Sequence, residues 1–216
     1  MAEAMKQTVA GMLKGIERYN PDNLTTLEKY VEIQSRENAY DLEANLAVLK
    51  LYQLNPQRFN IDITCQILLK ALTNFPHTDF VLCKCLLSEK IMQEEPISQI
   101  MYLGDVLEKC NFQHFWERVA NMSDLCDKIV GFQDSIRKFV CHVVGITFQT
   151  IDKGLLMQLL GEVDDNTAKH WIKKYGWKEE SDSVIFIANQ DENIKTKNIT
   201  EKIDFENVAG LMAACL

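Results

Sequence analysis

The sequence predicts a mostly α-helical protein, with a HEAT-like helical-repeat domain in residues 1–130 followed by a winged-helix domain in residues 131–190. Two observations predict this fold class. Apolar residues recur at three- and four-residue steps as far as about Gly131, which is the spacing of one face of a helix. Beyond Gly131, two short helical patterns precede a strand, a polar turn and a second strand. Residues 191–216 are expected to form a polar loop and a closing amphipathic helix.

The helical patterns of the first domain are separated by regular breaks. These fall at Asn20–Pro21, Tyr40, Pro56, Pro76, Pro96 and Cys110. Proline disfavours a helical conformation in the residue before it, whereas Pro96 also suits the first turn of the next helix. The breaks are about 14 to 20 residues apart, so a helix pair has the length of a helical repeat. No residue signature recurs between the pairs, so we expect an irregular α-solenoid, with a compact helical bundle as the alternative.

The helices of residues 131–176 are delimited by local signals. An apolar helix comes first and is expected to end within residues 145–148. Thr150 is expected to cap a second, short helix that ends at Gly161. Either Asp164 or Asp165 is expected to cap a third helix, which Gly176 ends. Two short helices joined by a tight turn form a helix-turn-helix unit, and a following β-hairpin makes it a winged helix.

The strand at Val184–Ala188 is apolar on both of its alternating faces. Such a strand is expected to be covered on both sides, either by the N-terminal helices or by a second protein. An exposed sheet edge also accepts a strand from a partner. Together with the closing amphipathic helix, it predicts a protein-interaction surface made of Val184, Ile185, Phe186, Ile187, Phe205, Val208, Leu211 and Met212.

The second helix of the helix-turn-helix unit carries a basic face. Its members are Lys169, His170, Lys173 and Lys174. In a DNA-binding protein this helix would enter the major groove. The predicted turn of the hairpin is acidic, with Glu179, Glu180 and Asp182, where a nucleic-acid-binding wing would contact phosphate. Two interpretations stay open: a solvated lysine face on a structural helix, or weak contact with phosphates of structured RNA.

The composition narrows the class of protein. The chain has 31 acidic and 23 basic residues, a net charge of −8, which disfavours an autonomous DNA- or RNA-binding protein. No apolar run approaches the roughly 20 residues of a membrane-spanning helix, and no export signal is present, so a cytoplasmic protein is expected. In that reducing compartment the seven cysteines are expected to be mostly buried free thiols.

No combination of residues predicts catalysis, a cofactor or a metal site. The chain has neither of the glycine-rich loops that hold nucleotide phosphates. Cys110 and His114 have the spacing of two ligands on one helix face, but a structural zinc ion needs four. Consecutive helical side chains diverge, so His142 is not expected to activate the thiol of Cys141. We therefore expect a protein that is not an enzyme.

Several long stretches of the sequence resemble the subunit k family of the eukaryotic translation initiation factor 3 complex. The similarity covers nearly the whole chain, in order, and is carried mainly by residues 37–56, 66–80, 139–147, 174–177 and 199–205. The resemblance implies a HEAT-like domain followed by a winged helix, related to scaffold subunits of the proteasome lid and the signalosome.

The same resemblance implies a function and partners. It implies a non-catalytic subunit of a large cytoplasmic complex that binds the small ribosomal subunit and promotes initiation. Subunit l is the implied direct partner, through winged-helix and C-terminal helical contacts. The family has no catalytic residue to transfer to this chain.

Overall fold

Helices form most of the computed structural model, which describes residues 2–181, 183–190 and 205–214. The N-terminal helices are α1 (Ala2–Met12), α2 (Leu24–Arg36), α3 (Leu42–Leu54), α4 (Ile61–Leu72), α5 (Asp79–Cys85), α6 (Glu89–Gln93), α7 (Ile97–Glu108), α8 (Phe112–Ala120) and α9 (Ser123–Cys126), with short 3-10 helices at Gly15–Tyr19, Pro21–Asn23 and Pro56–Arg58. The later elements are α10 (Phe132–Thr147), β1 (Thr150–Asp152), α11 (Lys153–Leu159), α12 (Asp165–Tyr175), β2 (Lys178–Glu179), β3 (Val184–Phe186) and α14 (Phe205–Ala213).

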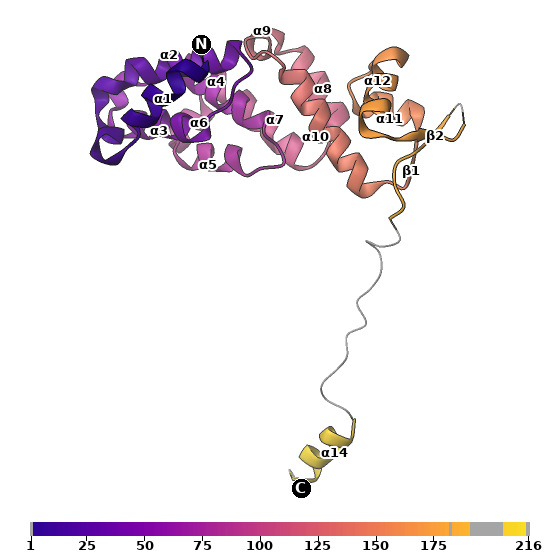
Figure 1. Cartoon of the computed structure of the whole chain (residues 1–216). Coiled ribbons are helices and arrows are strands. Elements are labelled where there is room, and N and C mark those ends of the chain that lie inside the picture. The colour runs from indigo at the N-terminus through magenta and orange to yellow at the C-terminus, as the bar shows by residue number, and fades with distance from the viewer. Residues whose placement is uncertain (1, 182, 191–204, 215–216) are drawn as a thin grey trace.

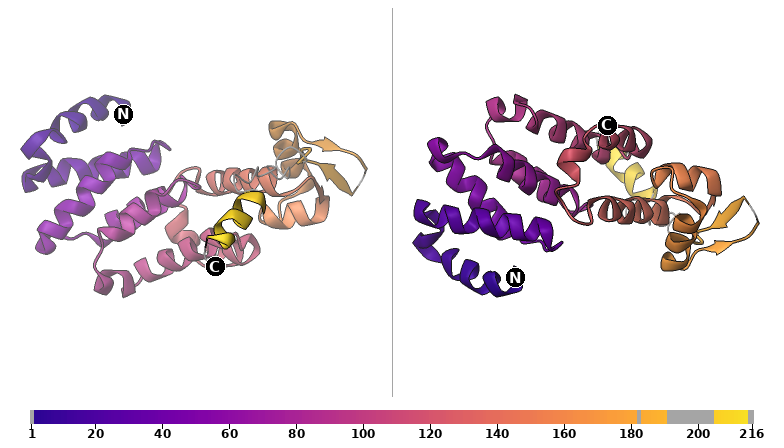
Figure 2. Two further views of the ribbon diagram at one scale, coloured as in Figure 1. Left: turned by 90° about the horizontal axis from the view of Figure 1, so that it is seen from below. Right: turned by 90° about the horizontal axis from the view of Figure 1, so that it is seen from above.

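These elements are arranged along an elongated molecule. Figure 1 shows the first helices at one end, the sheet with α11 and α12 at the other end, and α10 between them. Two further views show the N-terminal helices lying side by side in successive layers (Figure 2). Helix α14 lies apart from the other helices in Figure 1. The expected polar loop after Gln190 falls outside the described residues.

The predicted breaks coincide with the ends of helices because the signals are local. The Asp41 side chain accepts a hydrogen bond from the Ala44 amide at 3.1 Å and so caps α3. Asn60 caps α4 in the same way. Pro56 begins a 3-10 turn after α3, and Cys110, with φ of 54°, turns the chain between α7 and α8. The sequence did not predict the short helix α6.

The apolar faces of these helices meet in one core. Helix α2 packs on α3 and α4, α4 packs on α5 and α7, and α7 packs on α8. The side chains that fill this core are fully buried, and they include Leu27, Leu49, Leu51, Ile67, Leu68, Leu69, Leu72, Phe80, Ile97, Ile100 and Phe115. Burial of such side chains stabilises a fold by about 1.5–3 kcal/mol each, which makes this core the main source of stability.

Polar side chains inside the N-terminal helices bond to one another. The Asp79 carboxylate accepts hydrogen bonds from the Tyr40 hydroxyl at 2.7 Å and the Asn74 amide at 2.6 Å. Burial, followed by the bond to Asp79, raises the pKa of Tyr40 well above its ordinary value. Gln34 donates to Asn45 at 3.0 Å between α2 and α3. Since buried polar groups are costly when unpaired, these bonds fix how the helices pack.

The sheet has three strands rather than the two of the predicted hairpin. The strand order is β1-β3-β2 and both pairs are antiparallel, with Ile151 and Glu179 opposite Ile185. The prediction that Thr150 caps a helix is wrong, because Thr150 begins β1 and the cap of α11 is Asp152. The Asp152 carboxylate accepts a hydrogen bond from the Leu155 amide at 3.0 Å. Gly161 and Gly176 follow α11 and α12 with positive φ, as predicted.

Two side chains, one from α8 and one from α10, contact the end of α11. The indole Nε1 of Trp116 in α8 donates to the carbonyl of Leu159 at 2.8 Å. The Nε of Arg137 in α10 donates to the carbonyl of Leu160 at 3.1 Å, and its guanidinium lies 5.4 Å from the Trp116 ring centre. A Cβ atom on Gly161 would come within 2.8 Å of that ring. The end of α11 is therefore held by side chains from α8 and α10.

Candidate interaction surfaces

Strand β3 occupies the centre of the sheet, so it is not the exposed edge that the sequence predicted. Its pairing with β1 on one side and β2 on the other leaves no room for a partner strand along it. The Ile185 side chain is 0% exposed, and Ile187 just after the strand is also buried, so both belong to the core of this chain. Val184 and Phe186 are half-buried. Of the four predicted interface residues in this strand region, these two keep exposed surface.

The two outer strands carry the free edges of the sheet. In β1 the side chains of Thr150 and Asp152 are exposed and flank the buried Ile151. In β2 both Lys178 and Glu179 are exposed. Each outer strand has one strand neighbour among the residues that the structure describes. A strand edge without a neighbour presents backbone groups that a second chain can pair with.

After the sheet, the chain is held against the end of α10 by Gln190, a contact that the sequence did not predict. The buried Gln190 side chain donates from Nε2 to the carbonyls of Gly145 at 3.0 Å and Phe148 at 3.3 Å. These carbonyls lie at the C-terminal end of α10, where helical carbonyl groups lack an intrahelical donor. No local pattern marks such a contact, because 45 residues separate Gln190 from Gly145.

Helix α14 contains the second part of the predicted interface. Val208 is 37% exposed and Met212 is 67% exposed. The side chains of Phe205 and Leu211 lie outside the described part of the chain. The two described side chains place apolar surface in solvent, one turn apart on one face of the helix.

The basic face predicted on α12 divides into two groups. Lys169 pairs with Asp165 at 2.8 Å, and Asp165 also pairs with Lys153 at 2.5 Å. Hydrogen bonds from these two lysines lower the pKa of Asp165 to about 2. The remaining basic side chains, His170, Lys173 and Lys174, are exposed and have no carboxylate within ion-pair distance among the described residues.

Lys174 is positioned by an aromatic ring. Its Nζ lies 4.3 Å from the centre of the Trp171 ring, and the Trp171 side chain is 3% exposed. A cation over an indole face is attracted by the ring quadrupole. Glu179, which the sequence placed in the acidic turn, lies in β2, and its carboxylate is 3.9 Å from Lys153, so part of that negative charge is balanced within the chain. Asp182 falls outside the described residues.

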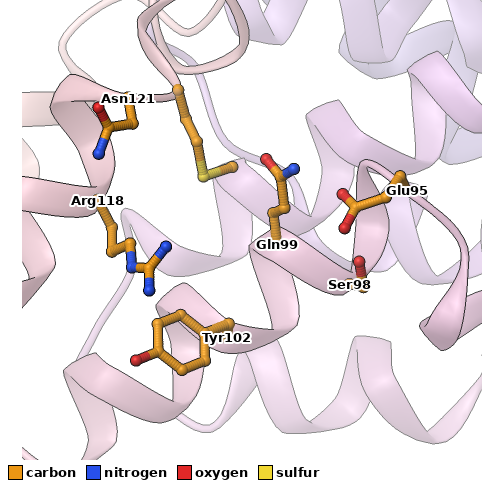
Figure 3. A pocket seen from close by; sticks show the side chains of 7 residues that line it. Glu95, Ser98, Gln99, Tyr102, Arg118 and Asn121 are labelled. Carbon is orange, nitrogen blue, oxygen red and sulfur yellow. The ribbon is translucent and has the colours of Figure 1, made fainter.

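A pocket of about 420 Å³ opens between α7 and α8 (Figure 3). The Arg118 guanidinium lies 5.1 Å from the Tyr102 ring centre, and Gln99 and Asn121 add amide groups to the lining. The pocket therefore combines a cation, an exposed ring and amides. This set can bind a polar segment, but it contains no nucleophile paired with a base.

Both ring nitrogens of His114, which lies beside this pocket, have partners within the chain. The Tyr102 hydroxyl lies 2.7 Å from Nε2 of His114, and the Glu117 carboxylate lies 3.2 Å from its Nδ1. Both ring nitrogens thus have partners within the chain, whereas Cys110 is exposed at the end of α7. No group of three or more histidine, cysteine or acidic side chains in the described part of the chain is arranged to hold a metal ion.

Four of the cysteines are packed in the core. Cys65, Cys83, Cys126 and Cys141 are buried free thiols, whereas Cys85 and Cys110 are exposed. Burial raises the pKa of Cys141 to about 12, so this thiol is not activated toward nucleophilic attack. None of the described helices has both the length and the apolar character needed to cross a membrane.

Comparison with known proteins identifies the class to which this helical chain belongs. Residues 58–198 match the CSN8/PSMD8/EIF3K family. The chain is 71% identical over 213 residues to "Eukaryotic translation initiation factor 3 subunit K" of Bombyx mori, covering 99% of this chain and 97% of the relative. It is 62% identical over 216 residues to the protein of that name from Anopheles gambiae, covering 100% and 97%. With the protein of that name from Homo sapiens it shares 58% identity over 214 residues, covering 99% and 98%.

The chain therefore belongs to the CSN8/PSMD8/EIF3K family and, within it, to the initiation factor 3 subunit K proteins. The resemblance of the five sequence stretches is confirmed. Three of them, 66–80, 139–147 and 174–177, lie inside the region matched by the family. The stretch 37–56 includes Tyr40 and Asn45, whose side chains bond to Asp79 and Gln34 within the chain.

Proposed function

We propose that this chain is a non-catalytic scaffold subunit of eukaryotic translation initiation factor 3 and takes part in assembling the ribosomal preinitiation complex through protein–protein contacts. The observation that carries the proposal is the sheet β1-β3-β2, whose outer strands each have one strand neighbour among the described residues, in a chain with 58–71% identity to subunit K proteins. Open strand edges support pairing with neighbouring subunits, and the scaffold acts in the cytoplasm, where translation takes place.

The proposal includes a division of the chain into domains. Residues 1–130 form a HEAT-like helical domain, residues 131–190 a winged helix, and residues 191–216 a loop with a C-terminal helix. The order helix, strand, two helices and two strands in α10, β1, α11, α12, β2 and β3 supports a winged helix. The packing of α2 on α3 and α4, and of α4 on α5 and α7, supports helical repeats.

The partners in this proposal are the other subunits of the initiation factor, subunit L most directly. The proposed contact surface consists of Val184 and Phe186 on the sheet together with Phe205, Val208, Leu211 and Met212 of α14. The small ribosomal subunit is reached through the assembled complex. Half-buried apolar side chains beside an open strand edge are typical anchors of a protein interface.

Charge substitutions on the two surfaces test this proposal. We expect Phe186→Asp, and separately the double change Val208→Asp with Met212→Asp, to weaken co-purification with subunit L by at least about tenfold, because each buries a charge in the interface. The matched control is Val81→Asp, which places the same charge on an apolar side chain of α5 that is 44% exposed. Circular dichroism verifies that each variant is folded.

Two results would contradict the interface. Folded variants that retain subunit L at the wild-type level would exclude these side chains from the contact. An equal loss in the Val81→Asp control would show that added negative charge, rather than the location, weakens the complex. Ile185→Asp is unsuitable for this test, because Ile185 lies in the core and its substitution would unfold the sheet.

A second candidate function is that of a nucleic-acid-binding adaptor that uses Lys169, His170, Lys173 and Lys174. One observation favours it: three of these cations are exposed without a carboxylate partner among the described residues. Lys169 contributes less, because its charge is balanced by Asp165. The net charge of −8 limits this function to contacts made inside a larger assembly, where other subunits hold the RNA in place.

A further inference from the structure

We propose that the cleft between the start of α10 and helix α12 binds a backbone phosphate of structured RNA, an inference that rests on the second candidate function. The cleft has a volume of about 440 Å³. Its lining comes from three separate parts of the chain and includes Asn38, Asp134, Lys138, Asn166, His170 and Lys174.

The charge balance inside the cleft is positive. Lys138 and Lys174 are exposed and have no carboxylate within ion-pair distance among the described residues. The one carboxylate in the lining, Asp134, already accepts a hydrogen bond from Arg137 at 3.2 Å. Two ammonium groups without counter-charges therefore face a small volume, and an anion entering it would gain charge-assisted hydrogen bonds.

The start of α10 adds a second favourable feature to the cleft. Gly131 precedes the helix with φ of 76° and provides no side-chain cap. A Cβ atom at this position would lie 2.8 Å from the Asn38 amide nitrogen, so glycine allows Asn38 to approach the helix start. The N-terminal end of a helix carries partial positive charge and free amide donors, which favour a phosphate.

The lining favours RNA over an acidic peptide. Peptide docking depends on apolar anchors, but the apolar side chain in this lining, Trp171, is almost fully buried. A further basic side chain flanks the cleft: exposed His142 lies one turn beyond Lys138 on α10. The RNA backbone presents regularly spaced phosphates, so a second phosphate can contact a basic side chain beside the cleft. A single carboxylate of a peptide cannot make this second contact.

Anisotropy of a labelled RNA hairpin, titrated with the full-length protein over a range of KCl concentrations, tests the cleft. We expect the double variant Lys138→Gln with Lys174→Gln to bind at least about tenfold more weakly, because two charge-assisted contacts are lost. The slope of log K against log salt should fall by about 1.5. The matched control is Lys29→Gln with Lys109→Gln, which removes the same charge from exposed lysines outside the cleft and should bind like wild type.

The outcomes separate failure of the cleft from failure of the RNA function. If Lys173→Gln abolishes RNA binding and the Lys138→Gln, Lys174→Gln variant does not, then RNA contacts the outer face of α12. That result would overturn the proposal that the cleft binds a phosphate. If wild-type protein shows no salt-dependent binding, both the cleft and the RNA function are overturned. Tighter binding of a glutamate-rich peptide than of the hairpin, lost in the cleft variant, would overturn RNA as the ligand. An equal loss of RNA affinity in the Lys29→Gln, Lys109→Gln control would overturn the assignment of the binding site to the cleft.

Discussion

The N-terminal helices and the sheet-containing C-terminal region differ in how far their polar groups are paired within the chain. Among the N-terminal helices, interior polar side chains bond to each other, as Tyr40 and Asn74 do with Asp79. In the C-terminal region, two outer strands keep an open edge, and Lys173 and Lys174 have no carboxylate partner among the described residues. A region whose polar groups are satisfied internally gains a defined packing, whereas one that leaves them open gains contacts with other molecules.

The largest expected effect comes from breaking the junction between these two regions. Trp116→Ala removes an aromatic side chain that packs on Arg137 and Gly161, together with the hydrogen bond to Leu159. We expect the free energy of unfolding to fall by about 3 kcal/mol, measured by equilibrium urea denaturation. Trp116→Phe keeps most of the ring and should lose about 1 kcal/mol. Equal losses in the two variants would contradict the role of ring packing.

An intermediate effect is expected at Lys70, an exception to the internal pairing of the N-terminal helices. Its side chain is 1% exposed, and no carboxylate of the described chain forms an ion pair with it. Burial lowers the pKa of Lys70 to about 8. We expect Lys70→Met to raise the free energy of unfolding by about 1–2 kcal/mol at neutral pH, because an apolar side chain of similar length avoids burying a charge.

The pH dependence of this effect has a defined sign. Between the folded pKa of about 8 and the ordinary value of 10.5, the unfolded chain binds the proton and the folded chain does not. Stability from this group therefore rises with pH across that window, and Lys70→Met should remove the rise in urea denaturation between about pH 7 and about pH 10. Lys29→Met, at an exposed position of α2, serves as the control. An identical pH profile for wild type and Lys70→Met would contradict the prediction.

The smallest effect is expected on the surface of α12, where Asp165 pairs with Lys153 and Lys169. The pKa of Asp165 is lowered to about 2, so its contribution to stability is present above its ordinary pKa of 3.8 and is lost as the pH falls toward 2. A carboxyl titration followed by NMR should place its midpoint near 2, and Lys169→Gln should raise it. Asp165 is exposed, so this variant should leave the urea denaturation curve close to wild type. A midpoint near 3.8 in the wild type would show that the pairs do not persist in solution.

Local chemistry explains which parts of the fold could be predicted. The helix breaks at Pro56 and Cys110 and the turns at Gly161 and Gly176 were predicted, because caps, prolines and positive φ angles act within a few residues. Strand β1 was missed because it is three residues long and its one apolar side chain, Ile151, becomes part of a strand only by lying opposite Ile185. Its presence moved β3 from the edge to the centre of the sheet.

For the candidate sites too, the sequence predicted part of the result and the structure decided the rest. The sequence identified the apolar run around β3 and the basic face of α12, but burial decided which members remain available: Val184 and Phe186 rather than Ile185. The Asp165 ion pair likewise separates Lys169 from Lys173. Burial of Ile185 depends on residues far along the chain and could not be assigned from the local pattern, whereas Asp165 and Lys169 are only four residues apart on one helix.

The sequence by itself determined the helical class of this protein, the positions of its main helix breaks, its acidic charge and its family. These properties depend on the periodicity of apolar residues, on composition and on similarity to known sequences, all of which can be obtained from the linear sequence. Only the tertiary structure decided that the sheet has three strands, that Trp116 and Arg137 hold the end of α11, and that Asn38, Lys138 and Lys174 line one cleft. The physical reason is that such contacts join segments separated by tens to more than a hundred residues and exist only when packing of the apolar core brings them together.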